Sequence, residues 1–131
     1  MDQLLVLGLV FLGITVGGYL VRTVARRQRQ VAIETLRLDP DASGQPRILS
    51  FFGPSCVACD RQKIVLTELE RDRPERFSLE YRDATVDYDY ARQFGLMVVP
   101  TTVVIAGSGA IAAINSGFTP QEKLEAQLDA A

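Results

Sequence analysis

The sequence predicts an α/β fold with a mixed central sheet flanked by helices, preceded by a single N-terminal helix that can cross a membrane. Two observations lead to this prediction. The chain of 131 residues opens with an uncharged apolar run, and from residue 48 onward the pattern is strand, helix, strand, helix, hairpin, helix. A content of 47% hydrophobic and 23% charged residues is typical of one globular domain with an appendage.

The N-terminal segment carries no charge from Gln3 to Val21. A helix over the 18 residues from Leu4 to Val21 would span roughly 27 Å, close to the hydrocarbon thickness of about 30 Å. A cleaved signal peptide is one alternative, but its basic N-terminal region is missing before Leu4. A buried core helix is another, but this segment is apolar on all sides. We therefore expect an uncleaved anchor over residues 1–24.

The orientation of this anchor follows from four arginines that come just after it, whereas no basic side chain precedes it: Arg22, Arg26, Arg27 and Arg29. The positive-inside rule then predicts that the N-terminus lies outside and the folded domain in the cytoplasm. The anchor itself makes the lipid bilayer an expected partner. A domain that faces outward is the alternative. Gly13 and Gly17 form a GxxxG pair that would let two spans approach closely, but Gly is common in such spans, and a homodimer is the less favoured interpretation.

The charge of the remaining chain limits the partners. Residues 31–131 hold 10 basic and 15 acidic side chains, a net charge of −5, and nucleic acid binding needs a basic face instead. The sequence has neither a GxGxxG motif nor a P-loop, so we expect no cofactor. Two cysteines are too few for a disulfide-rich secreted scaffold.

The first elements follow from apolar patterning. Residues 25–46 are expected to form a basic juxtamembrane tether with a short first element, and residues 47–131 the folded domain. The apolar run over residues 48–52 predicts a buried strand. Residues 60–73 are amphipathic and predict a helix, which Pro74 ends.

The later elements are indicated in the same way. Alternation over residues 77–81 predicts a strand, and fourfold spacing over 86–94 predicts a short helix. Two strands over 101–106 and 110–115 are joined by a Gly-Ser-Gly turn and predict a hairpin. The last helix is expected to begin with a capping box, in which Thr119 is the N-cap and Glu122 the partnering acid.

Both cysteines of the chain, Cys56 and Cys59, lie in the stretch FFGPSCVAC. Cys56 falls at the turn from strand to helix, where unsatisfied N–H groups and the helix dipole stabilise a thiolate. Cys59 lies on the same helix face and is placed to attack a mixed disulfide on Cys56. Because the chain has no His, a Cys-His hydrolase mechanism is excluded. The pair is thus expected to be catalytic, as a redox-active disulfide.

Two other roles for the cysteines remain open at this point. A structural zinc site needs four ligands, and this chain supplies two thiolates, so only a dimer would complete it. An inert disulfide would close a very small loop, adding little stability, and would tend to be reduced in the cytoplasm. We favour exchange chemistry without a metal, on protein disulfide or thiol substrates, with a recycling reductase or oxidant as a partner.

The region from Arg47 to Ala130 resembles the thioredoxin family. The stretch ILSFFGPSCVACDRQK is similar to its strand, CxxC motif and helix, and FGLMVVPTTVVI to its hydrophobic residue and cis-proline before a strand. The stretch GSGAIAAINSGFTPQEKLEAQL is similar to its terminal hairpin and last helix. The resemblance implies a thioredoxin fold with a cis Pro100 packed opposite the cysteines. It also implies a substrate-binding segment Val99-Pro100-Thr101, whose first residue offers backbone groups to an extended substrate. A trans Pro100 that opens an edge strand is the alternative.

Several positions depart from the family pattern. Ser50 stands where thioredoxins bury an Asp that moves protons, so water or a carboxylate elsewhere has to substitute. Glu80 and Asp83 are candidates, but we favour their interpretation as solvated charges at the end of a strand. Ser55 replaces the usual Trp. Asp60 brings a negative charge that opposes thiolate formation on the first cysteine.

The function predicted from the sequence is therefore that of a membrane-tethered thiol–disulfide oxidoreductase that exchanges or reduces protein disulfides. Two alternatives are a thioredoxin-fold binding or scaffold module with little redox activity, and an outward-facing protein of envelope thiol maintenance.

Overall fold

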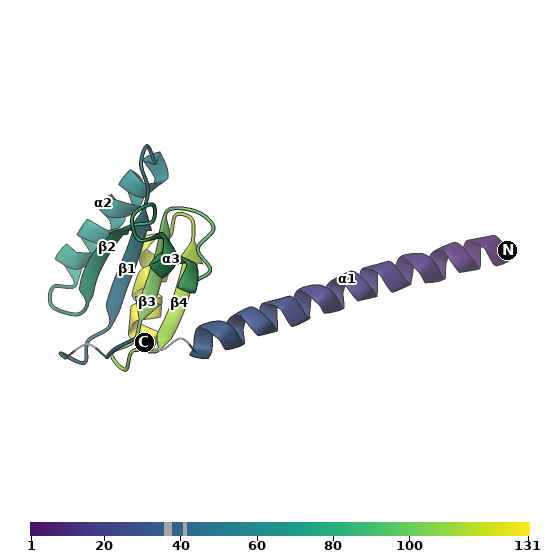
Figure 1. Ribbon diagram of the computed structural model, residues 1–131, viewed down its shortest axis with the longest axis horizontal. Coiled ribbons are helices and arrows are strands. Elements are labelled where there is room, and N and C mark those ends of the chain that lie inside the picture. Colours follow the sequence, from purple (N-terminus) through teal and green to yellow (C-terminus); the bar gives the residue numbers. More distant parts are fainter. Residues whose placement is uncertain (36–37, 41) are drawn as a thin grey trace. The chain divides into compact units, whose positions relative to one another are not determined.

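The computed structural model describes residues 1–35, 38–40 and 42–131, with only the backbone described for residues 29–35. The chain forms two compact units, Met1–Thr35 and Leu36–Ala131. Figure 1 shows the first unit as one long helix and the second as a sheet with helices packed on it.

The first unit is helix α1, Asp2–Thr35. The helix continues beyond the anchor expected over residues 1–24, because neither Gly nor Pro interrupts the sequence between Gly18 and Pro40. The first part of the expected tether is therefore helical. Residues 36, 37 and 41 of that tether, and the side chain of the predicted orientation signal Arg29, lie outside the described residues.

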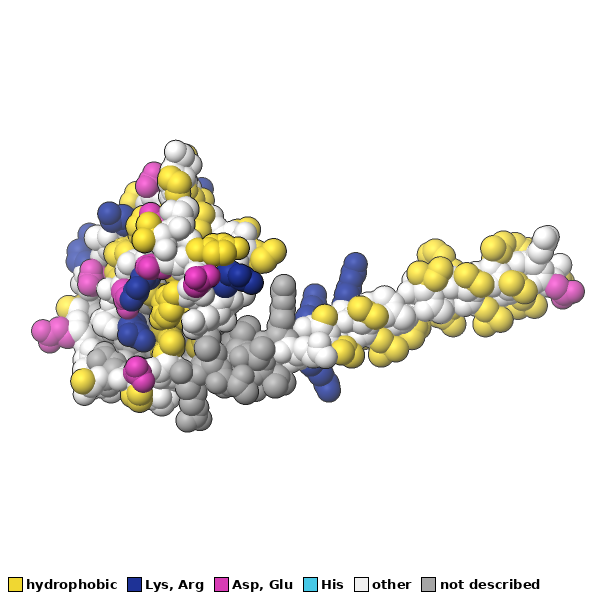
Figure 2. All heavy atoms as spheres, viewed as in Figure 1, with side chains coloured by type: hydrophobic (Ala, Val, Ile, Leu, Met, Phe, Trp, Pro, Cys, Tyr) yellow, Lys and Arg dark blue, Asp and Glu magenta, His cyan; other side chains and the backbone are white. Residues whose placement is uncertain are grey.

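Helix α1 is long and apolar enough to cross a membrane. Among the described residues, Asp2–Gln28 is the one stretch that is long and apolar enough to cross a bilayer, by length and composition. Figure 2 shows hydrophobic side chains along most of α1 and basic side chains toward its C-terminal part. The Thr15 hydroxyl donates to the carbonyls of Phe11 and Leu12 at 3.1 and 2.9 Å, so this polar group is satisfied within the helix.

The second unit is built on a four-stranded mixed sheet, as the sequence predicts. The order is β2-β1-β3-β4, with β1 parallel to β2, and β3 antiparallel to both β1 and β4. The strands are β1 Arg47–Phe52, β2 Ser78–Asp83, β3 Thr101–Ile105 and β4 Ile111–Ser116. Because β3 runs antiparallel to β1, the first residue of β3 lies beside the carboxyl end of β1.

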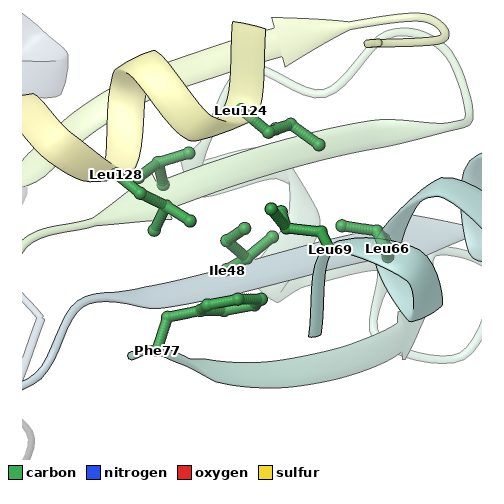
Figure 3. Packing of buried hydrophobic residues seen from close by; sticks show 7 residues of the cluster. Ile48, Leu66, Leu69, Phe77, Leu124 and Leu128 are labelled. Atoms are coloured by element: carbon green, nitrogen blue, oxygen red, sulfur yellow. The ribbon is translucent and has the colours of Figure 1, made fainter. Parts of the chain in front are cut away.

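One face of the sheet is covered by helices α2, Val57–Asp72, and α4, Gln121–Ala130. Their apolar side chains meet those of β1 and the segment before β2, and Figure 3 shows this core around Ile48. Leu66, Leu69 and Leu124 are fully buried in it. Burying each such side chain contributes about 1.5–3 kcal/mol, so this core fixes α2, and with it the cysteine segment, on the sheet.

The opposite face carries the short helix α3, Tyr88–Gln93, and a second core. Phe51 of β1 packs against Phe94 with ring centroids 5.6 Å apart, and Phe94 meets Tyr90 edge-on at 5.3 Å. Ile48 and Phe51 point to opposite faces because side chains alternate along a strand. This explains why β1 is an almost continuous apolar run.

The start of α4 differs from the prediction. The helix begins at Gln121 and its N-cap is Pro120, without a side-chain capping bond. The predicted capping box at Thr119 is therefore wrong. The physical reason is a fully buried side chain on α2: the Gln62 amide donates to the Thr119 carbonyl at 3.0 Å and accepts from its N–H at 2.7 Å. These two bonds hold Thr119 outside the helix, and its hydroxyl bonds to the Gly117 carbonyl instead.

The predicted hairpin between β3 and β4 is confirmed. Its turn binds the segment of the chain that precedes β1. The N–H of Leu38 donates to the carbonyl of Gly109 at 3.0 Å. Gly109 has φ +85°, and a Cβ there would collide with the Leu38 carbonyl, so the turn requires a glycine.

Candidate redox site

The site begins at the carboxyl end of β1, where Cys56 starts helix α2. Cys56 is the N-cap residue: its sulfur accepts the backbone N–H of Cys59 at 3.1 Å, and its carbonyl accepts the N–H of Asp60 at 3.2 Å. The helix therefore begins earlier than the amphipathic pattern over residues 60–73 suggests. A hydrogen bond to sulfur favours the thiolate over the thiol, and the partial positive charge of the helix N-terminus acts in the same direction.

The two cysteines are joined to each other in a disulfide, with their Cα atoms 5.2 Å apart. Their exposure differs. Cys56 is partly exposed, whereas Cys59 is 8% exposed and buried behind it. An incoming thiolate or disulfide can therefore reach the sulfur of Cys56 more readily than that of Cys59.

The peptide bond between Val99 and Pro100 is cis, as the resemblance implies, and it lies opposite the cysteines. The Val99 carbonyl oxygen is 3.9 Å from Sγ of Cys56. Gly53, just after β1, makes this approach possible, because a Cβ on Gly53 would lie only 3.1 Å from Cγ2 of Val99.

The three predicted substrate-binding residues have different environments. Val99 is partly exposed and its backbone lies outside the ladder of β3, which begins at Thr101. Pro100 is buried, and its carbonyl accepts the N–H of Gly117 at 2.8 Å. Thr101 is fully buried, and its hydroxyl donates to the Val98 carbonyl at 2.7 Å. Pro100 and Thr101 thus hold the loop, while Val99 remains accessible.

Exposed apolar side chains adjoin this centre. One follows Cys56, two precede Val99 and one follows Gly117. In this order they are Val57, Met97, Val98 and Phe118, which are 75%, 79%, 49% and 40% exposed. The guanidinium of Arg61 lies 4.9 Å from the centroid of the Phe118 ring. Sequence reasoning missed this set, because exposed apolar residues in loops look the same as core residues in a pattern.

A cavity of about 320 Å³ adjoins the buried cysteine on the α2 side of the sheet. It is lined by Cys59 together with residues of β1, α2, β2 and the cis-proline loop: Ser50, Phe51, Phe52, Gly53, Asp60, Lys63, Tyr81 and Pro100. Ser50 is 3% exposed and pairs with Tyr81 across the parallel strands.

The carboxylates that the sequence suggests as substitutes for a buried Asp are not part of this lining. Glu80 neighbours Tyr81 on β2, so its side chain points to the other side of the strand, where it bonds to Arg82 at 2.6 Å. Asp83 accepts the hydroxyl and N–H of Thr85, and these bonds hold its pKa below the ordinary value. Neither carboxylate lines the cavity, and each has a local partner, so these contacts give no support to either candidate. Within the described part of the chain, no group of three or more His, Cys, Asp or Glu is placed to hold a metal ion.

Comparison with known proteins agrees with this geometry. Thioredoxin of Methanocaldococcus jannaschii is 31% identical to this chain over 58 residues, which make up 44% of this chain and 68% of that protein. The chain belongs to the thioredoxin family. No family model matches the sequence.

Solved structures show the thioredoxin fold as well. A malarial protein is 23% identical, with a TM-score of 0.60 over 66% of this chain and 96% of that one. Thioredoxin-2, a component of the malaria parasite protein secretion machinery, is also 23% identical, with a TM-score of 0.62 over 66% of this chain and 84% of that one. Membership of the thioredoxin family, together with the disulfide between Cys56 and Cys59, indicates thiol–disulfide redox chemistry in general.

Proposed function

We propose that this thioredoxin-family chain is a membrane-tethered oxidoreductase that exchanges or reduces disulfides of protein substrates. The observation that carries the proposal is the hydrogen bond from the Cys59 N–H to the Cys56 sulfur, at a helix start that faces the Val99 carbonyl. This arrangement supports a nucleophilic Cys56 in the reduced protein, because it stabilises the thiolate without a neighbouring histidine.

The proposed reaction has two exchange steps. The Cys56 thiolate attacks one sulfur of a substrate disulfide, a mixed disulfide forms, and the second substrate sulfur leaves as a thiolate. Cys59 then attacks the Cys56 sulfur, which closes the protein disulfide and releases the first substrate sulfur. Two electrons pass from the protein to the substrate, and a dithiol reductant must return them. The reverse sequence would oxidise a substrate dithiol.

Substrate positioning would fall to the loop around the cis-proline. The Val99 backbone lies outside the β3 ladder, which supports pairing with an extended substrate segment in the manner of an added strand. The exposed side chains of Met97, Val98 and Phe118 favour apolar residues in that segment. Pro100 and Thr101 would act by holding Val99 in position.

The proposed location is a single-span membrane anchor, α1, with the N-terminus outside and the domain in the cytoplasm. Its support is the length and composition of Asp2–Gln28 and the arginines that follow its most apolar part, Arg22, Arg26 and Arg27 among the described side chains.

The test of the chemistry uses the Cys59→Ser variant of the full chain. Without the resolving thiol, mixed disulfides on Cys56 should accumulate and be seen as reducible adducts on a nonreducing gel. The matched control is Cys56→Ser, which keeps one thiol but should trap nothing, because Cys59 is buried. A Cys59→Ser variant that traps no partner would contradict the oxidoreductase proposal and favour the binding-module alternative.

The test of location uses Glu68→Cys in a Cys56→Ala, Cys59→Ala background, whose single exposed thiol reports on the compartment without being trapped by substrates. In intact cells a membrane-impermeant maleimide should label this thiol only after lysis. Strong labelling without lysis would show that the domain faces outward. Recovery of the full chain in the soluble fraction would contradict the anchor.

A further inference from the structure

The cavity beside Cys59 has a polar lining that the proposed exchange steps do not use. Four of its side chains carry polar groups, namely Ser50, Asp60, Lys63 and Tyr81. Its volume of about 320 Å³ is large against the roughly 30 Å³ that one water takes up in the liquid, so it has room for several waters. The cavity therefore has room for a chain of waters beside the buried cysteine.

The resolving step requires a route for a proton. In the reduced protein Cys59 must lose its proton before its sulfur can attack, and a side chain that is 8% exposed has little direct contact with bulk water. A base next to the cavity would lower the barrier to this transfer, because proton transfer to a positioned group accelerates such steps.

The polar residues that line the cavity differ in the ability of their side chains to accept a proton. The Ser50 hydroxyl is not a base at neutral pH, and the Lys63 ammonium is a donor without an acceptor. Tyr81 on β2 stays protonated, because burial raises the pKa of its hydroxyl. The Asp60 carboxylate is an acceptor and directly follows Cys59 in α2. The other lining residues besides Cys59 have no proton acceptor in their side chains: Phe51, Phe52, Gly53 and Pro100.

We infer that Asp60 accepts the proton of Cys59 through water in this cavity during the resolving step, an inference that rests on the proposed exchange function. The Cys59 S–H bond breaks as the proton passes to the carboxylate. The Cys59 sulfur then bonds to the Cys56 sulfur while the bond from Cys56 to the substrate breaks, and the substrate leaves as a thiolate. Asp60 afterwards releases the proton to solvent.

The position of Lys63 is consistent with Asp60 as the proton acceptor. Lys63 lies one helical turn beyond Asp60, also lines the cavity, and has its Nζ 5.9 Å from the centroid of the Tyr81 ring. A positive charge at this place offsets the negative charge of Asp60, which by itself would oppose formation of the Cys59 thiolate.

Because the negative charge of Asp60 opposes thiolate formation, the two possible roles of Asp60 predict opposite effects of Asp60→Asn on the rate of the resolving step. If Asp60 acted only through its charge, Asp60→Asn would favour the Cys59 thiolate and speed resolution at neutral pH. If Asp60 is the proton acceptor, the same substitution slows resolution at neutral pH. The slowing then disappears at high pH, where Cys59 ionises without help.

The experiment follows the reduced full chain in detergent, mixed with a substoichiometric aromatic disulfide such as dithiobis(nitrobenzoate). The first nitrothiobenzoate released reports attack by Cys56, and the second reports attack by Cys59. For Asp60→Asn we expect a first phase that is no slower than the native rate, because loss of the negative charge favours the Cys56 thiolate, and a second phase at least about tenfold slower near pH 6.5. This difference should narrow as the pH rises, because Cys59 then ionises without a carboxylate acceptor.

Two variants serve as controls. Asp60→Glu keeps a carboxylate and should restore much of the second phase. Glu68→Gln removes an exposed carboxylate from the same helix, away from the cavity, and should leave both phases unchanged. A second phase in Asp60→Asn that is unchanged, faster, or slowed equally at every pH would overturn the inference while leaving the exchange function intact. A native protein without a first phase would refute the exchange function, and the inference with it.

Discussion

The backbone N–H of Cys59 donates to Sγ of Cys56 at 3.1 Å, so the first cysteine is the N-cap of the helix that carries the second. The sulfur occupies the place that a Ser or Asp oxygen takes at many helix starts. A sulfur that accepts such a bond gains most from it as a thiolate, since hydrogen bonds to charged groups are the stronger ones. One hydrogen bond thus serves both the start of α2 and the reactivity of Cys56.

This relationship predicts a lowered thiol pKa for reduced Cys56. In Cys59→Ala the backbone N–H is retained, so the pH midpoint of Cys56 alkylation by iodoacetamide should stay below about 8.5, the ordinary thiol value. The control is Glu68→Cys in a Cys56→Ala, Cys59→Ala background, which puts the thiol on the exposed middle of the same helix. Equal midpoints for the two thiols would show that the N-cap position gives no activation.

The approach of Val99 to Cys56 predicts the effect of a single added methyl group. Gly53→Ala places a Cβ about 3.1 Å from Cγ2 of Val99, so the cis-proline loop has to shift away from Cys56. We expect the rate with a protein disulfide to fall by about tenfold or more, since displacements of about 1 Å have effects up to 10²-fold. The pH midpoint of Cys56 alkylation should change little.

The compensating variant sharpens this prediction. Val99→Ala removes the methyl group that clashes, so the Gly53→Ala, Val99→Ala double variant should be less impaired than the sum of the single effects. Strictly additive effects on the rate with a protein disulfide would contradict a direct contact between these two residues.

The elements of the fold were predictable because each leaves a local pattern. The apolar run of β1 and the alternation in β2 are readable within a few residues, and the Gly-Ser-Gly turn marks the hairpin. The family resemblance added the cis peptide bond at Pro100, which no local pattern distinguishes from a trans proline at the edge of a sheet.

The parts that could not be predicted depend on contacts between distant segments. The capping box at Thr119 has the right residues, but Gln62, 57 positions earlier, binds the Thr119 backbone and moves the helix start. The cavity at Cys59 likewise needs the pairing of Ser50 with Tyr81, and strand register is not visible in a single sequence. Of the carboxylates suggested on β2, Glu80 lies on the face opposite Tyr81, and this becomes apparent only once Tyr81 is placed.

The hydrogen bonds from Thr85 to Asp83 predict a contribution to acid stability. They hold the pKa of Asp83 below its ordinary value of 3.8 in the folded protein. A depressed folded-state pKa stabilises the fold above the unfolded value, and this stabilisation is lost as the pH falls through the folded-state pKa. In Thr85→Val the pKa of Asp83 should rise toward 3.8, as measured by a carboxyl-carbon NMR titration, whereas Thr85→Ser should stay close to the native chain. The same pKa in Thr85→Val and the native chain would show that the hydroxyl has no part in the shift.

The contact between Gln62 and Thr119 predicts one of the larger losses of stability available in this domain. Gln62→Leu keeps a similar volume in a fully buried position but leaves the N–H and carbonyl of Thr119 without these partners. Buried unsatisfied groups cost about 1–3 kcal/mol each, so the free energy of unfolding should fall by about 2 kcal/mol or more. Urea unfolding followed by tyrosine fluorescence measures this loss. Gln93→Leu, at an exposed position of α3, is the matched control and should stay within about 0.5 kcal/mol of the native chain. If Gln62→Leu lowered the free energy of unfolding as little as Gln93→Leu does, some other contact would have to hold Thr119 before α4. In that case the Thr119 amide would keep its protection from hydrogen exchange in Gln62→Leu.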